Sequence, residues 1–544
     1  MEEHLGALVT AAIIVFQLIS WGRRILSRTR SVEPPGSAAA PSAAGRPVAA
    51  PTAAGPEAAA EGLQAAVSRE VGKVARQVGR GEALLADLPA LRDQLWGAGP
   101  TGRVLVEVLD ERVSPALEQA VARGRALSQR LGSAPLPAAI ALLQSPEALA
   151  PVGEIAEVHQ YAHVLRQMAV WRSDPRLGRL LADADAIAAS LLEPIQRMAG
   201  VQGFVFPQQR PICAPADRDA EALWLGLLPE GYPVIFVPDD FSEDLYRQAS
   251  LAHEVGHLLW LRVPGLADEL RAVTDLRSSG QVLEWDGQQV RGAVGWPFGA
   301  WLPELFADAV CVLMLGPAGL RGLTHSFASP QSPGGVVAGH LDPDGYYDEH
   351  PPAHLRVHLA GALLHRMGFD QETKPILDEW DALHGHPDAL VLPTRDGPRV
   401  SVPFTQLRAF GADVMERIYT APLATLDGID LQDLPGLEMS PGMWAKVKRH
   451  AAELAEGRPF HEDGRLALAS AIEARASHPD RLARIESGLL RAVLGRDADD
   501  RLAPDAHYNR GLVPRGAHGK LAHQVLDGLL LADILVPRRV GSRR

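Results

Sequence analysis

The chain of 544 residues is too long for one compact hydrophobic core, so we expect two to four domains. Its composition, 47% hydrophobic and 22% charged, is typical of a folded globular protein and excludes a wholly disordered one. The formal net charge of -13 argues against nucleic acid as a partner, because counterion release from a phosphate backbone needs a basic surface. Two cysteines, Cys213 and Cys311, are too few for a disulfide framework and are expected to be buried thiols.

The first 30 residues contain an apolar stretch that is just long enough to cross a bilayer as a helix. Residues 5–21 carry no charge, and the basic segment 22–30 follows at once. The acidic start is unlike that of a secretory signal peptide. We expect a membrane anchor over residues 1–30, and the arginines that follow it place the rest of the chain in the cytoplasm. The alternatives are an interfacial or partner-packing helix on an otherwise cytoplasmic protein and, third, a cleaved signal peptide.

Composition and hydrophobic spacing divide the rest of the chain into four parts. Residues 31–62 are nearly all Ala, Pro, Gly and Ser, which predicts a flexible linker. Residues 63–200 place apolar side chains three and four positions apart, which predicts a helical domain. Residues 401–544 show the same spacing with mixed charge and end in a basic tail, which predicts a helical C-terminal domain. Either helical domain could bind a protein partner.

Residues 201–400 combine strand and helix patterns. Three short runs, 203–211, 221–228 and 232–241, are aromatic or β-branched and are bounded by Pro, Gly or Asp, so they are expected to be strands. The next segment is expected to form a helix with Ser242 as its N-cap, ending near Val263. We therefore expect a small sheet followed by a helix, an α+β arrangement.

This helix carries two histidines one turn apart. His253 and His257 project from one face, so both imidazoles can reach one ion at about 2 Å. Glu254 is rotated by about 100° from His253, which keeps it out of coordination and lets it accept a proton from a metal-bound water. Neutral nitrogen ligands, a carboxylate base and an open position are what a catalytic zinc site needs. The alternative is an accidental spacing in a helix.

A second apolar segment supplies a third ligand. Residues 301–320 read as a helix interrupted by only two acids, Glu304 and Asp308, one turn apart. Two buried carboxylates would be costly without partners. We expect Glu304 to complete a site for one Zn²⁺ per chain, and Asp308 to hold the free ring nitrogen of a ligand histidine. A solvated helix edge is the alternative.

The order His253-Glu254-x-x-His257 followed by Glu304-x-x-x-Asp308 resembles the gluzincin group of zinc metallopeptidases. Residues 304–318 also resemble poorly characterised bacterial metallopeptidase-like proteins, and residues 348–364 are similar to a His-Pro and Arg segment of integral-membrane gluzincins. The resemblance implies a zincin-like core, a small twisted sheet with active-site helices, over roughly residues 200–370. It also implies zinc-dependent hydrolysis of peptide bonds in a peptide or protein substrate.

Four further residues are candidates for contact with the substrate or the oxyanion. Arg356 could be a buried anchor, or His350, Tyr346 or Tyr347 could lie near the cleft and stabilise the tetrahedral oxyanion. Packing and capping roles are equally compatible with this segment. His354 and His358 share a helix face but have no accompanying glutamate base.

We therefore expect an α+β protein with a zincin-like metallopeptidase domain at 201–400, flanked by mainly helical regions. An edge strand of the sheet, with residues 232–238 as the candidate, could hold an extended substrate by β-pairing. The competing hypothesis is a non-catalytic metal-binding scaffold or regulatory protein whose helical domains bind a partner. A latent protease covered by its helical domains is the third.

Overall fold

The computed structural model divides the chain into two units, residues 1–65 and 66–544. It describes residues 56–494 apart from 203–205, 207–209, 217–220, 226–231, 239–240, 242–243, 277–281, 286–287, 292–294, 328–349, 395–396, 435, 459 and 461–462. The membrane anchor predicted at 1–30 and most of the linker predicted at 31–62 lie outside the described residues. So does the basic tail.

The protein is mostly helical with a few short strands, which places it in the α+β class. Helix α2 (Pro56–Gly97) begins inside the segment for which the sequence predicts a linker. Proline is tolerated in the first turn of a helix, and the Ala and Glu residues that follow are strong helix formers, so the linker prediction extends too far.

Residues 63–200 form helices, as predicted. After α2 come α3 (Gly99–Val108), the π-helical turn η1 (Leu109–Val113), α4 (Ser114–Ser133), α5 (Leu136–Leu143), α6 (Pro146–Ser173) and α7 (Pro175–Gln202). The apolar spacing explains the packing: Leu84, Leu88, Leu91 and Leu95 repeat every three or four residues along α2, and all four are buried.

A buried ion pair connects these helices to the sheet. Arg172 of α6 donates to both carboxylate oxygens of Asp185 on α7, at 2.7 and 3.1 Å, and also to the carbonyl of Cys213, at 2.7 Å. The backbone N–H of Cys213 in turn donates to Asp185 Oδ1 at 2.6 Å. Because each charge is hydrogen-bonded, the pair is tolerated in the core and holds the first strand against α6 and α7.

Three strands form a sheet before the helix that carries His253 and His257: β1 (Ile212–Ala216), β2 (Glu221–Leu225) and β3 (Tyr232–Pro238). Their order is β1-β3-β2, with β3 parallel to β1 and antiparallel to β2. Most of the strand expected at 203–211 lies outside the described residues, and β1 begins directly after it at Ile212. Since β3 is paired on both sides, it is not the edge strand that the sequence suggested for substrate pairing. Strand β2 lies at an edge of the sheet and packs on the helix that carries His253.

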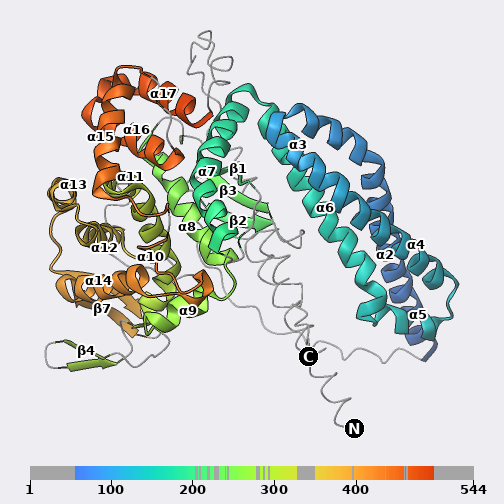
Figure 1. The fold of residues 1–544 in the computed structure, drawn as a ribbon. Helices are drawn as coiled ribbons and strands as arrows, with labels where there is room; N and C mark the ends of the chain where they lie inside the picture. The colour runs from blue at the N-terminus through green and yellow to red at the C-terminus, as the bar shows by residue number, and fades with distance from the viewer. Residues whose placement is uncertain are drawn as a thin grey trace, which may run out of the picture. The chain divides into compact units, whose positions relative to one another are not determined.

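Beyond the sheet the chain returns to helices (Figure 1). They are η2 (Arg247–Ala249), α8 (Ser250–Arg262), α9 (Leu266–Val273), α10 (Gly295–Leu315), α11 (Pro317–Phe327), α12 (Ala353–Arg366) and α13 (Asp370–His384). Ser242 is not the N-cap of the helix that carries His253: α8 begins at Ser250 after a 3₁₀ turn with Ala249 as its N-cap, and Ser242 lies outside the described residues.

Two hairpins were not predicted. They are β4 (Val282–Trp285) with β5 (Gln288–Arg291), and β6 (Ala389–Thr394) with β7 (Gly397–Pro403). An Asp-Gly pair, at 286–287 and at 396–397, occurs in both hairpin sequences, and this dipeptide favours tight β-turns. That signal was available in the sequence.

The described part of the C-terminal region is helical, as predicted, with α14 (Phe404–Thr420), η4 (Ala424–Leu426), α15 (Pro441–Ala455), α16 (Gly464–Ser477), η5 (Pro479–Arg481) and α17 (Leu482–Leu494). One hydrophobic cluster runs from Val78 to Leu489, so these helices share a core with α8 and α10. Cys213 and Cys311 are buried free thiols, as expected. Within the described ranges one stretch, Pro297–Leu315, is long and apolar enough to cross a membrane, but 83% of it is buried inside the protein.

Candidate metal centre

Close packing of α8 on α10 brings the predicted ligands together. A Cβ added to Gly256 would lie 2.6 Å from the Cα of Ala307, so the two helices approach more closely than any side chain at position 256 would allow. Gly256 precedes His257 directly, and Ala307 lies between the two acids of α10. The small residues at this crossing therefore set the distance between the histidines and the carboxylates.

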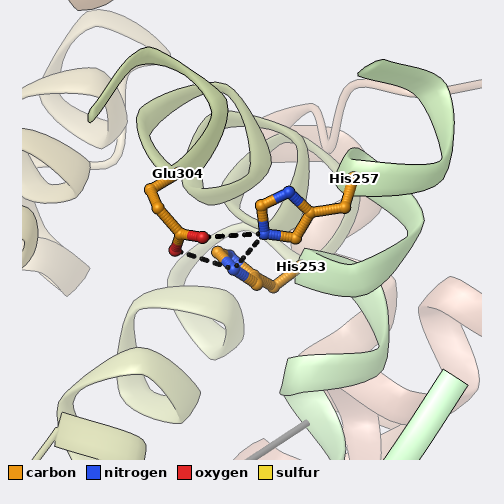
Figure 2. Close-up of side chains that lie close together, drawn as sticks. All are labelled: His253, His257 and Glu304. Carbon is orange, nitrogen blue, oxygen red and sulfur yellow. Dashed lines mark hydrogen bonds and ion pairs between the residues drawn. The ribbon is translucent and has the colours of Figure 1, made fainter. Parts of the chain in front are cut away.

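Three ligand atoms converge at this crossing (Figure 2). His253 Nε2 lies 3.1 Å from His257 Nε2 and 3.3 Å from Glu304 Oε2, and His257 Nε2 lies 3.1 Å from Glu304 Oε1. A tetrahedral ion with ligand bonds of about 2.0–2.1 Å separates its ligand atoms by about 3.3–3.4 Å. The donor set and its spacing therefore fit a zinc ion.

The second acid of α10 supports the first histidine. His253 Nδ1 lies 3.0 Å from Asp308 Oδ1, which leaves Nε2 directed at Glu304 and His257. Burial lowers the pKa of His253, but the hydrogen bonds to Asp308 and Glu304 and the charges of these carboxylates outweigh it and raise the pKa to about 10 in the metal-free protein. Asp308 thus selects the tautomer in which Nδ1 carries a proton and Nε2 is the ligand atom.

Arg356 of α12 forms ion pairs with both acids of α10. It pairs with Glu304 Oε2 at 2.9 Å and with both oxygens of Asp308, and its guanidinium also stacks on the ring of Phe327, 4.3 Å from the centroid. Burial raises the pKa of Glu304, but the charge of Arg356 and the two histidines hold it well below its ordinary value. The carboxylates therefore stay ionised and able to bind a cation.

Glu254 faces the same region of the core. It follows His253 on α8 and is only 2% exposed. Its charge raises the pKa of Arg356 and of the Cys311 thiol on α10, although burial and nearer charges contribute more. Glu254 therefore lies close enough to Arg356 and Cys311 for its charge to act on both, in the region where a proton acceptor could serve a water bound between the ligands.

The candidates for contact with the substrate or the oxyanion lie in different environments. Arg356 is buried between Glu304 and Asp308, so it occupies the position of an anchor rather than of a group open to substrate. His350 lies just before α12 with 60% of its side chain exposed, and its Nε2 is 3.6 Å from Glu304 Oε1, at the margin of the centre. Tyr346 and Tyr347 lie outside the described residues.

The structure brings together a second group of possible metal ligands, which the sequence analysis did not predict as a metal site. His354 and His358 of α12 meet Asp381 near the end of α13, within metal-ligand reach of one another. The acid comes from a segment that carries no zinc motif, so only the packing of α13 on α12 reveals the cluster.

Comparison with known proteins adds no relative. A scan against protein-family models found no match, and searches of the curated proteins and of the solved structures found none either. The likeness to gluzincins therefore rests on the residues of α8 and α10 and on the distances between them.

Proposed function

We propose that this protein is a zinc-dependent metallopeptidase of the gluzincin type with a zincin-like core. The single observation that carries the proposal is the convergence of two histidine nitrogens and one glutamate within 3.1–3.3 Å, with an acid behind the first histidine. A structural zinc site needs four protein ligands and no base, whereas a catalytic site keeps three ligands and an open position. His253, His257 and Glu304 with Glu254 alongside match the catalytic pattern.

Each residue has a chemical role in this proposal. His253, His257 and Glu304 hold Zn²⁺, which when bound supplies an electrophile that polarises a peptide carbonyl and makes water more acidic. Glu254 takes the proton from the attacking water and delivers it to the departing amine. Asp308 and Arg356 orient the ligands. Among the described strands β2 lies at an edge of the sheet and packs on α8, and an extended peptide could pair with that edge.

The test is zinc content beside peptide hydrolysis in the full chain. Glu254→Gln should keep about one zinc at this centre and lose about 10²–10⁴-fold in the hydrolysis of an unfolded protein such as reduced casein. Glu304→Gln should lose the metal and the activity together. The matched control is Glu107→Gln, which removes an exposed glutamate of α3 and should change neither. Undiminished hydrolysis by Glu254→Gln would show that this glutamate is not the base.

A latent or non-catalytic metal-binding protein is the second candidate, and the burial of the centre favours it. Glu254 is 2% exposed, and the side chains of Glu304 and His257 are 6% and 17% exposed. A peptide cannot reach Glu254 unless some covering segment moves. Limited proteolysis of the zinc-loaded full chain distinguishes a latent enzyme from one that is active when intact. Hydrolysis of the casein substrate that appears only after the chain has been cut indicates a latent enzyme. Hydrolysis by the uncut chain indicates that the centre is accessible without cleavage.

A further inference from the structure

The cluster of His354, His358 and Asp381 shares no residue with the first centre. The two histidines are one turn apart on α12, and Asp381 lies in the last turn of α13, which packs against α12. One ligand atom from each residue lies within 4.8 Å of the others. The arrangement repeats that of the first centre: two histidines at i and i+4 on one helix and an acid on its neighbour.

The carboxylate of Asp381 is surrounded by imidazoles. Its Oδ1 is 2.9 Å from His358 Nε2 and 3.8 Å from His354 Nε2, and its Oδ2 is 3.4 Å from His386 Nδ1. Among the described residues no lysine or arginine forms an ion pair with it, although its side chain is only 11% exposed. A nearly buried carboxylate without a cationic partner is costly, and a bound cation would remove that cost.

Trp380 decides which of these histidines can be a ligand. Its indole N–H donates to His354 Nδ1 at 3.0 Å, and an indole nitrogen can only donate. His354 Nδ1 must therefore carry a lone pair, so in the neutral ring the proton sits on Nε2, the atom that faces Asp381. This is the opposite tautomer to that of His253, and it excludes His354 from coordination while Trp380 stays in place.

We propose that His358 Nε2, the carboxylate of Asp381 and His386 Nδ1 form a second site for a divalent transition-metal cation. His358 Nε2 lies 2.9 Å from Asp381 Oδ1, and His386 Nδ1 lies 3.4 Å from Asp381 Oδ2. Each imidazole therefore approaches a different carboxylate oxygen, and the exposed ring of His386 must turn toward His358 for both to reach one ion. Two imidazoles and one carboxylate favour zinc, nickel or cobalt over calcium or magnesium, which prefer oxygen ligands.

The chain around His386 allows that side chain to close the site. Helix α13 ends at His384, and Gly385 has a φ of 77°, a conformation that favours glycine and turns the chain sharply. His386 follows with 80% of its side chain exposed, so its ring can move without disturbing the core. A cation held there would join α12 to the end of α13 and so fix the helix that also carries Arg356.

The experiment counts zinc ions in the full chain after metal removal and dialysis against buffered free Zn²⁺, by mass spectrometry. The wild type should hold about two zinc ions per chain, His257→Ala about one, and the His257→Ala, Asp381→Asn double variant none. His386→Ala should lose one ion without loss of folding, because its side chain is exposed. The control is His365→Ala, which removes another histidine of α12 and should change nothing.

The zinc content of each variant shows which part of the proposal is wrong. Equal zinc content in the wild type and Asp381→Asn would overturn the second site, whereas equal content in the wild type and His257→Ala would overturn the first. Retention of both ions by His386→Ala would overturn the ligand assignment. Trp380→Phe removes the donor to His354 but none of the proposed ligands, so the second ion should stay bound. Loss of that ion would contradict the exclusion of His354 and with it the ligand assignment.

Discussion

Arg356 donates two hydrogen bonds of 2.8 Å, from Nε and Nη2, to the two carboxylate oxygens of Asp308. The same Nη2 is 2.9 Å from Glu304 Oε2. Since Asp308 also lies 3.0 Å from His253 Nδ1, one guanidinium on α12 orients an acid that orients a histidine on α8. Three helices are thereby connected through charged groups that are almost completely buried.

Removing the guanidinium of Arg356 should destabilise the metal-free protein. Arg356→Met leaves Glu304 and Asp308 buried without their partner, which costs about 3–5 kcal/mol in the free energy of unfolding. Arg356→Lys keeps the charge but loses the two-pronged geometry, so its cost should be smaller. Urea unfolding with a chelator present measures both. The control, Arg366→Met at an exposed position of the same helix, should cost at most about 1 kcal/mol, and a cost equal to that of Arg356→Met would contradict the prediction.

The contact between Gly256 and α10 should control both stability and metal affinity. In Gly256→Ala the new methyl carbon would meet Ala307 Cα at 2.6 Å, so the helices must separate. We expect a loss of about 1–3 kcal/mol in stability and weaker zinc binding, because the histidines move away from Glu304. Calorimetric unfolding and zinc titration test this. Gly79→Ala on α2, where a Cβ meets nothing within 4 Å, should stabilise slightly; a similar response at both glycines would exclude the steric explanation.

Zinc binding at the first centre should release a proton from His253. Its pKa of about 10 in the metal-free protein means that the ring is charged at neutral pH, and zinc must displace that proton. Zinc affinity should therefore rise with pH, with release of about one proton per ion near pH 8. Isothermal titration in buffers of different ionisation enthalpy measures the release. A binding enthalpy that is the same in every buffer would be incompatible with a charged His253.

The raised pKa of His253 also determines how the stability of the metal-free protein depends on pH. The folded pKa of about 10 exceeds the ordinary value of 6.5, so His253 stabilises the metal-free fold fully below pH 6.5, and this contribution disappears as the pH rises through 10. Asp308→Asn should reduce both the proton release and this stabilisation, since the carboxylate is a main cause of the shift.

Glu486 of α17 should also make stability fall as the pH rises, but in a lower pH range than His253. Burial raises its pKa from 4.5 to about 7, so the folded state holds the proton more tightly than the unfolded state and loses stability as the pH rises from 4.5 through 7. Glu486→Gln should be more stable than the wild type above pH 7, by about 1–2 kcal/mol after solvent screening, and equal to it below pH 4.5. Thermal unfolding across this range is the measurement. Glu193→Gln, at an exposed position, should show no such crossover.

The fold could be predicted where local spacing decides it. The apolar repeat of α2 and the runs of β2 and β3 lie where the sequence indicated. The start of α8 could not be predicted, because the 3₁₀ turn before it depends on how Gly322 of α11 packs against Ala249. The position of β3 within the sheet was also missed, since strand order is a property of the assembled sheet and not of one strand.

For the candidate site, the sequence by itself determined which groups can act together on one helix. The period of 3.6 residues places His253 beside His257 and Glu304 beside Asp308, whatever surrounds them. Only the tertiary structure decided how far α8 lies from α10, that Arg356 balances both acids, and that Trp380 forces the opposite tautomer on His354. These depend on contacts between residues far apart in the chain, where steric fit and hydrogen-bond direction, rather than helical period, set the outcome.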